Sequence, residues 1–192
     1  MATEEPNYTL IKKSENFELR NYEPKIIAEV VINGSIKQAS NRGFRLIADF
    51  IFGNNTSVDG NSSKISMTAP VTMENKSKSE KIDMTAPVTM EKKQNESMDQ
   101  WLMHFVMPSK YSMETLPKPN NPQVKVREIP QTNYAVIRFS GFTSENKIKE
   151  KTNLLLNWMK ELELEPTGQP EIARYNSPMM PSFFRRNEVM IS

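Results

Sequence analysis

The sequence predicts an α+β fold, in which one antiparallel sheet curls into a distorted barrel flanked by two α-helices. Short stretches of alternating apolar and polar residues, typical of half-buried strands, recur along the 192 residues. Only two stretches have the apolar spacing of an amphipathic helix. Short strands joined by turns, with so few helices between them, indicate an antiparallel sheet rather than a parallel α/β sheet.

The first strands lie near the N-terminus. A short apolar cluster, Tyr8–Ile11, is closed by two lysines. Phe17–Tyr22 largely alternates apolar and polar residues, and Lys25–Ile32 places its apolar residues on one face. Glu23-Pro24 separates these two stretches. We therefore expect two consecutive strands at Phe17–Tyr22 and Lys25–Ile32.

The first helix has recognisable signals at both ends. Ser35 and Gln38 have the capping-box spacing, in which the side chain of each residue bonds to the backbone amide of the other. Apolar residues then recur at helical spacing as far as Gly53, which fits a left-handed helix stop. These signals predict a helix over Ser35–Phe52.

After a polar loop, one segment of the chain occurs twice. Lys64–Asn75 returns as Lys81–Lys92, and ten of the twelve residues are identical. Each copy alternates like a strand, and its proline indicates a bulge or an edge because proline cannot donate to a sheet ladder. We expect a duplicated strand segment over 64–92.

The second part of the chain repeats the pattern of strands and a helix. Five further strands are expected at Gln100–Met107, Val124–Ile129, Tyr134–Phe139, Ile172–Tyr175 and Glu188–Ile191. A second amphipathic helix opens at Thr143 or Ser144 and ends at Pro166–Gly168.

A longer internal repeat relates the two parts. Moving Phe17–Gly34 by 107 positions places it on Val124–Gly141, with three identities and the apolar parity largely kept. Both copies lead into a capped amphipathic helix. We therefore predict one domain over 1–192, built from two strand–strand–helix halves at about 8–63 and 115–165.

Composition excludes several classes of function. The chain has no cysteine, which excludes disulfides, cysteine–zinc sites, iron–sulfur clusters and thiol catalysis. The net charge is only +2, and no apolar run is long enough to cross a membrane. We therefore expect a cytoplasmic monomer with no nucleic-acid partner and no membrane span. No nucleophile-elbow, phosphate-loop or dinucleotide-binding motif is present, so we expect no enzymatic activity and no catalytic or metal-binding residue.

Methionine is unusually frequent, at 13 residues. The pairs Met67/Met73 and Met84/Met90 have three interpretations. Thioethers favour Cu(I), but methionines on one side of a strand also fill gaps in an apolar core. They would equally provide a deformable wall for a large flat apolar ligand.

A few polar residues are candidates for binding. His104, the single histidine, is chemically competent as an axial heme ligand or serves as a structural hydrogen-bonding group. Arg42 and Arg45 lie at the polar edge of the first helix, where they meet ligand carboxylates or only solvent. The charged turn Arg185–Glu188 either closes the barrel through salt links or binds an anion.

Several motifs together resemble the SOUL heme-binding protein family, in family order from about Tyr8 to Ile191. These are Glu18-Leu-Arg-Asn-Tyr22, the duplicated Met-Thr-Ala-Pro-Val, Phe105-Val-Met-Pro-Ser109, Phe139-Ser-Gly-Phe142, Tyr175-Asn-Ser-Pro178 and Arg186-Asn-Glu-Val189. The resemblance implies a duplicated α+β barrel with two flanking helices. It also implies a shallow apolar groove near the first helix that binds heme or another tetrapyrrole.

The resemblance supplies further candidates for the groove, and two departures from its pattern. The full predicted cofactor-binding set is Arg42, Phe44, Arg45, Ile47, Ile51, Met67, His104 and Met180. Asn21 stands where some members have a histidine proposed as a heme ligand, and neither Asn41 nor Asp49 is basic where others have basic residues. We therefore expect heme to bind weakly, mainly through apolar contacts.

The leading hypothesis is a non-enzymatic carrier or buffer of heme or a related tetrapyrrole. The same superfamily includes bacterial effector-binding domains. The alternative is therefore a ligand-sensing or protein-interaction module that uses the same barrel for another flat apolar molecule. A tetrapyrrole-modifying enzyme is a third reading, but no set of residues in the sequence argues for it.

Overall fold

The computed structural model describes residues 4–76, 99–177 and 179–192. The main sheet has nine strands, in the order β1-β2-β9-β11-β10-β5-β6-β3-β8, and all neighbours in it are antiparallel. Its strands are β1 Tyr8–Ser14, β2 Phe17–Tyr22, β3 Lys25–Asn33, β5 Val71–Asn75, β6 Gln100–Val106, β8 Lys125–Ile129, β9 Thr132–Phe139, β10 Glu171–Arg174 and β11 Asn187–Ile191. The remaining elements are α1 Ile36–Ile51, α2 Glu145–Glu161, a 3₁₀ turn at Ser182–Phe184, and a two-stranded sheet of β4 Asn55–Thr56 and β7 Lys118–Pro119.

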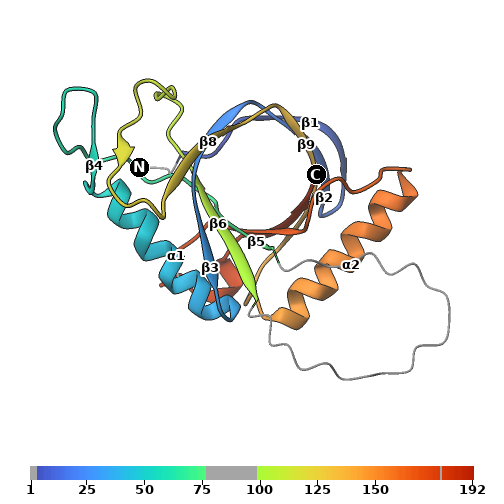
Figure 1. The fold of residues 1–192 in the computed structure, drawn as a ribbon. Coiled ribbons are helices and arrows are strands. Elements are labelled where there is room, and N and C mark those ends of the chain that lie inside the picture. Colours follow the sequence, from blue (N-terminus) through green and yellow to red (C-terminus); the bar gives the residue numbers. More distant parts are fainter. Residues whose placement is uncertain (1–3, 77–98, 178) are drawn as a thin grey trace, which may run out of the picture.

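The sheet curls into an open barrel with both helices on its outside. Figure 1 looks along the barrel and shows the strands as a ring, with α1 and α2 against its outer surface. The predicted fold class is therefore confirmed. The duplicated unit is also present, because β2, β3 and α1 in the first half correspond to β8, β9 and α2 in the second.

Each helix packs its apolar face on the outer face of different strands. The core beneath α1 joins helix residues such as Ile47 to Val30 of β3 and Met103 of β6. The core beneath α2 joins Leu155 to Ile137 of β9. Side chains alternate between the two faces of a strand, so the intervening residues of these strands point into the barrel.

The start of α1 and its approach to the sheet follow from local chemistry. Ser35 and Gln38 form the predicted capping box. A Cβ at Gly43 would lie 2.7 Å from Cδ1 of Ile32 and 2.8 Å from Sδ of Met103. Glycine at this position therefore lets α1 lie close against β3 and β6.

The structure differs from the sequence prediction in β1 and β5. Strand β1 extends to Ser14 although all its residues are exposed, because an edge strand takes its hydrogen bonds from β2 and needs no buried face. In the first copy of the duplicated segment only Val71–Asn75 is a strand, and Thr68 forms an isolated bridge with Glu4. The second copy lies outside the described residues.

Candidate functional site

The outer face of α1 carries one exposed aromatic side chain. Phe44 is 41% exposed, and its ring centroid lies 5.7 Å from that of Phe105 on β6. Ile47 and Ile51, predicted to line the groove, are completely buried in the core between α1 and the sheet. Phe44 is therefore the exposed aromatic residue that α1 offers to a ligand, whereas the two isoleucines are not accessible.

Met67 lies beyond the C-terminal end of α1. The amide of Ile65 donates to the carbonyl of Ile51 across 2.9 Å, and this bond holds the 65–67 segment against the helix end. Met67 is 38% exposed, so its thioether is accessible to a ligand. Arg42 and Arg45 are exposed on α1, and neither forms an ion pair within the part of the chain described.

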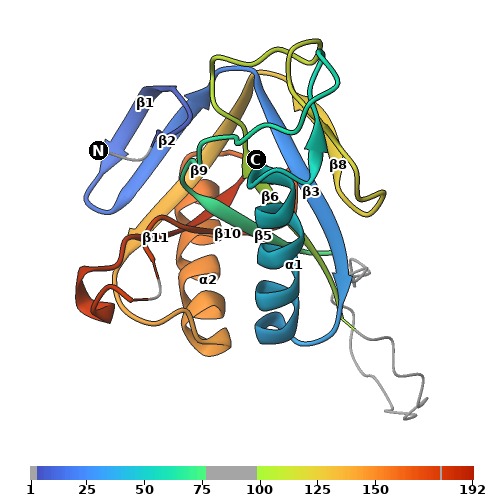
Figure 2. The same ribbon diagram turned by 90° about the vertical axis from the view of Figure 1, so that its left-hand side faces the viewer.

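Met180 lies in the loop between β10 and β11 and is also 38% exposed. Figure 2 shows this loop, in red, with α2 standing between it and α1 in that view. The structure thus places Met180 in a loop separate from α1, the helix that carries Phe44.

Arg174, at the end of β10, connects this loop to α1 and was missed by sequence reasoning. Its Nη1 donates to Oγ of Ser40 on α1 across 3.0 Å, and its Nε is buried without a hydrogen-bond partner. Burial lowers the pKa of the guanidinium from its usual value, but an arginine stays charged. Among the described residues no carboxylate forms an ion pair with it, so the outer face holds an uncompensated, partly buried cation. The alternation of residues along β10 could have identified Arg174 from the sequence, because Arg174 lies on the same face of the strand as the buried Ile172.

His104 lies on the other side of the sheet from these residues. It alternates on β6 with Phe105, and its side chain is buried inside the barrel, where Nε2 lies 3.8 Å from Oε2 of Glu171. Its Nδ1 has no hydrogen-bond partner. Burial, followed by the charges of Lys25 and Arg127, lowers the pKa of His104 to about 3. The imidazole is therefore neutral at pH 7, and the sheet separates it from Phe44.

The barrel interior around His104 holds several titratable groups. Burial raises the pKa of Glu171 to about 7 although Tyr134 donates a hydrogen bond to its carboxyl across 3.0 Å. The ammonium of Lys25 lies 4.5 Å from the ring centroid of Tyr22 and 5.4 Å from that of Tyr134. A cavity of about 690 Å³ borders Lys25 and Val106, and residues 4–7 line another side of it.

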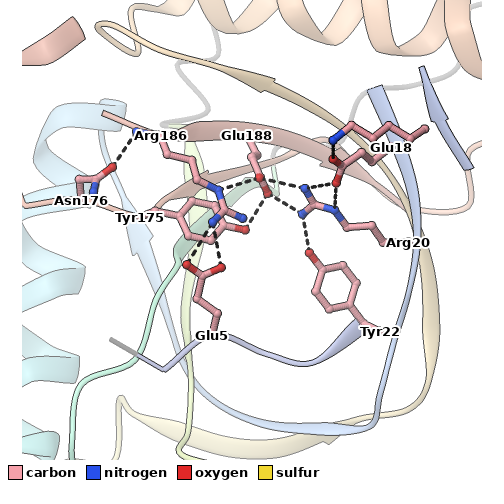
Figure 3. Close-up of polar contacts among 9 residues, drawn as sticks. Glu5, Glu18, Arg20, Tyr22, Tyr175, Asn176, Arg186 and Glu188 are labelled. Atoms are coloured by element: carbon pink, nitrogen blue, oxygen red, sulfur yellow. Dashed lines mark hydrogen bonds and ion pairs between the residues drawn. The ribbon is translucent and has the colours of Figure 1, made fainter. Parts of the chain in front are cut away.

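A second polar cluster closes the barrel interior (Figure 3). Arg20 of β2 forms two contacts with the carboxylate of Glu188 on β11, at 2.9 and 3.1 Å. Tyr175 donates to the same carboxylate across 2.6 Å, and Arg186 bridges it to Glu5 near the N-terminus. The sequence left two interpretations of the turn Arg185–Glu188, closure of the barrel through salt links or an anion site. For Arg186 and Glu188 the structure supports closure of the barrel.

Burial alone raises the pKa of the Glu188 carboxyl. The hydrogen bond and the charge of Arg20 outweigh that effect, with help from Tyr175 and Arg186, and leave the pKa below its usual value. Glu188 is consequently an anion at neutral pH, and its partners satisfy it. This cluster closes the barrel, because both oxygens of the Glu188 carboxylate have arginine partners.

The comparison with known families agrees with the resemblance that the sequence motifs indicated. A model of the SOUL heme-binding protein family matches residues 3–79 and 72–192. The chain belongs to this family. Each of the two matched stretches contains one copy of the duplicated segment. No curated protein sequence matches the chain significantly.

Solved structures share the SOUL chain's fold at low identity. The C-terminal domain of EcmrR has a TM-score of 0.62 and 12% identity, with 96% of each chain covered. An uncharacterized conserved protein from Listeria innocua has a TM-score of 0.62 and 11% identity, with 93% of this chain and 92% of that chain covered. A hydrolase from Listeria innocua has a TM-score of 0.59 and 10% identity, with 94% of this chain and 93% of that chain covered. At such identities the likeness shows the fold alone.

The described residues contain neither a candidate membrane-spanning helix nor a candidate metal-binding group. No helix in the described part of the chain is long and apolar enough to cross a membrane. Within the same residues, no group of three or more His, Cys, Asp or Glu side chains is arranged to hold a metal ion.

Proposed function

We propose that this SOUL family member is a non-enzymatic, cytoplasmic carrier or buffer of heme or a related tetrapyrrole, which binds on the outer face of the sheet beside α1. The uncompensated guanidinium of Arg174 carries this proposal. A tetrapyrrole with carboxylate side chains supplies the anion that Arg174 lacks, and charge-assisted bonds between arginine and carboxylate are among the stronger hydrogen bonds in proteins.

The apolar part of the ligand has its own candidates on the same face. The ring of Phe44 is exposed on α1 and packs below on Phe105, so it offers a supported aromatic surface. The exposed thioether of Met67 adapts its shape to a flat ligand. Arg42 and Arg45 are exposed on the same helix as Phe44 and add positive charge to α1.

The described residues offer little for iron. His104 faces the barrel interior, and Asn21 lies on β2, where it donates a hydrogen bond to Asn133 across 2.6 Å. Neither side chain lies with Phe44 and Arg174. The ligand would then be held by apolar contacts and by its own carboxylate, with at most a thioether near the iron. Such binding is weak and reversible, which suits a carrier or a buffer.

A hemin titration followed in the Soret band tests the proposal, with the variant Arg174→Gln beside the wild type. We expect saturable binding by the wild type and binding about 10 to 150 times weaker by the variant, because a charged hydrogen bond contributes about 1.5 to 3 kcal/mol. The dimethyl ester of hemin, which lacks both carboxylates, should bind the two proteins equally. Equal hemin affinity for the two proteins would remove Arg174 from the site.

The apolar contact has a matched control on the other helix. Leu154 of α2 has the same exposed fraction as Phe44, 41%. Phe44→Ser should weaken hemin binding, whereas Leu154→Ser and His104→Ala should leave it unchanged. Absence of any saturable spectral change with the wild type would refute tetrapyrrole binding as a whole.

A second candidate function is binding of another small molecule inside the barrel, as a ligand-sensing module. The observation that favours it is the buried pair of Glu171 and His104, whose Nδ1 has no partner. The charge of Lys25 acts on both groups, and Lys25 also borders the cavity of about 690 Å³. A thermal-shift screen separates the two functions, because a ligand that binds only the folded state raises its melting temperature. Suppose that a ligand raises the melting temperature of the wild type and of Arg174→Gln but not that of Glu171→Gln. This result would favour the interior site.

A further inference from the structure

One end of the molecule holds a strongly basic cavity that neither candidate function uses. It has a volume of about 570 Å³ and lies between the end of β9, the first turns of α2 and the loop before β11. Five of its lining residues are cations, namely Arg138, Lys147, Lys151, Arg185 and Arg186, and none is an aspartate or a glutamate. The overall net charge of +2 therefore conceals a local concentration of positive charge.

Carboxylates outside the lining neutralise only part of this charge. Glu150 contacts both Lys147 and Lys151 at 3.1 Å. Arg186 is paired with Glu188 and with Glu5. Because Lys147 and Lys151 share one carboxylate and Arg138 forms no ion pair with a described residue, positive charge remains in excess beside the cavity.

Large apolar side chains project from the rim of the same cavity. Phe183 and Phe184 are 67% and 69% exposed, with ring centroids 4.4 Å apart. Phe142 and Met179 are 70% and 93% exposed, and neither lines the cavity. A soluble ligand inside the cavity would leave Phe142 and Met179 in water, whereas a surface that covers the whole rim would bury them.

Backbone contacts hold the two projecting loops together. The amide of Gly141 donates to the carbonyl of Ser182 across 3.0 Å, and Asn187 donates to the carbonyl of Gly141 across 3.0 Å. The guanidinium of Arg185 lies 5.6 Å from the ring centroid of Phe142. Figure 2 shows the red loop at the edge of the molecule, and the exposure of Met179, Phe183 and Phe184 leaves their side chains available to a large flat partner.

We propose that this end of the protein docks onto the surface of bilayers that contain anionic phospholipids. Aromatic and methionine side chains of the rim enter the interfacial region, while the arginines and lysines bind the phosphate groups of the lipids. The arrangement provides both features that an anionic membrane surface binds, because exposed apolar side chains lie next to a group of cations.

Co-sedimentation with vesicles tests the proposal. Vesicles of phosphatidylcholine with phosphatidylserine should bind the protein, vesicles of phosphatidylcholine alone should bind it much less, and added NaCl should release it. Arg138→Gln/Lys151→Gln should lower the partition coefficient about fivefold for each charge removed, as expected from about 1 kcal/mol per basic residue near such a surface. Phe183→Ser/Phe184→Ser should abolish the binding that remains at high salt.

Matched controls come from another exposed region of the chain. Phe52 and Val58 are 57% and 79% exposed, and Lys118 and Lys125 are exposed cations away from the cavity. Phe52→Ser/Val58→Ser and Lys118→Gln/Lys125→Gln should bind vesicles like the wild type. Equal losses in the control variants would contradict the assignment to this surface.

A separate measurement reports insertion. Brominated acyl chains should quench the additional fluorescence of Phe183→Trp and not that of Phe52→Trp. Failure of the wild type to bind phosphatidylserine vesicles would overturn the proposal. Binding of inositol hexakisphosphate or a single-stranded oligonucleotide at Arg138 and Lys151, without vesicle binding, would assign the cavity to a soluble polyanion or to nucleic acid instead.

Discussion

Arg20 and Glu188 are 168 residues apart in the sequence, yet they form a two-contact ion pair inside the barrel, with donor–acceptor distances of 2.9 and 3.1 Å. Both side chains are almost completely buried. Strands β2 and β11 do not pair with each other but both pair with β9, so the contact connects strands that the sheet itself leaves apart. The stability of the barrel should therefore depend on it.

Removal of one partner leaves a buried charge without its counterion. We expect Arg20→Met to lower the free energy of unfolding by about 3 kcal/mol, measured by urea denaturation. Arg127→Gln, which breaks the half-exposed pair with Glu29, should cost less than about 1 kcal/mol. The double variant Arg20→Met/Glu188→Leu should lose less than the sum of its single variants, and additive losses would contradict coupling between the two residues.

His104 should make the protein less stable in acid. Its pKa of about 3 in the fold lies below the ordinary value of 6.5, so the unfolded chain binds the proton more readily. The contribution is complete above about pH 6.5 and is lost as the pH falls toward 3, at up to roughly 1.4 kcal/mol per pH unit. His104→Gln does not titrate, so its free energy of unfolding should fall less than that of the wild type over this range. If the free energy of unfolding fell equally with pH in the wild type and in His104→Gln, the imidazole would not be buried.

Glu171 should act in the opposite direction. Its pKa of about 7 in the fold lies above the ordinary value of 4.5, so the folded state holds the proton more tightly. The wild type should lose stability from this group as the pH rises from 4.5 to 7, with no further loss above. Glu171→Gln keeps a hydrogen-bond acceptor for Tyr134 and removes the titration. Its melting temperature should therefore rise relative to the wild type across that window, and a constant difference would argue against a buried carboxyl.

One copy of the duplicated segment should suffice for the barrel. Strand β5 ends at Asn75, which pairs with Trp101 of β6, so a hairpin loop of a few residues can join these strands. Deletion of 76–92 keeps β5 and should change the free energy of unfolding by less than about 1 kcal/mol, as loop shortening costs little. Deletion of 64–80 should have the same small effect, because Lys81–Lys92 then follows Ser63 and carries the same apolar residues. Circular dichroism and thermal melting of both variants measure this. Loss of the fold in the second variant would show that the two copies are not interchangeable.

The sequence by itself determined the local elements. Capping at Ser35 and the stop at Gly53 bound the first helix, and alternation of apolar residues located most of the strands, because these signals depend on neighbouring residues along the chain. Alternation fails for β1, an exposed edge strand, and for Lys64–Pro70, which has strand-like spacing without strand pairing. The family motifs added the duplicated barrel, which the structure confirms. The predicted groove residues remain predictions.

The tertiary structure alone decided which residues meet. Parity already separated His104 from Phe105, but only the packing of α1 decides that Phe105 faces the helix and His104 the barrel interior. The contact of Arg174 with Ser40 spans 134 residues and follows from the position of β10 beside β5. Such contacts depend on strand order and on the curl of the sheet. Both are set by the packing of the whole chain and not by the residues next to each position.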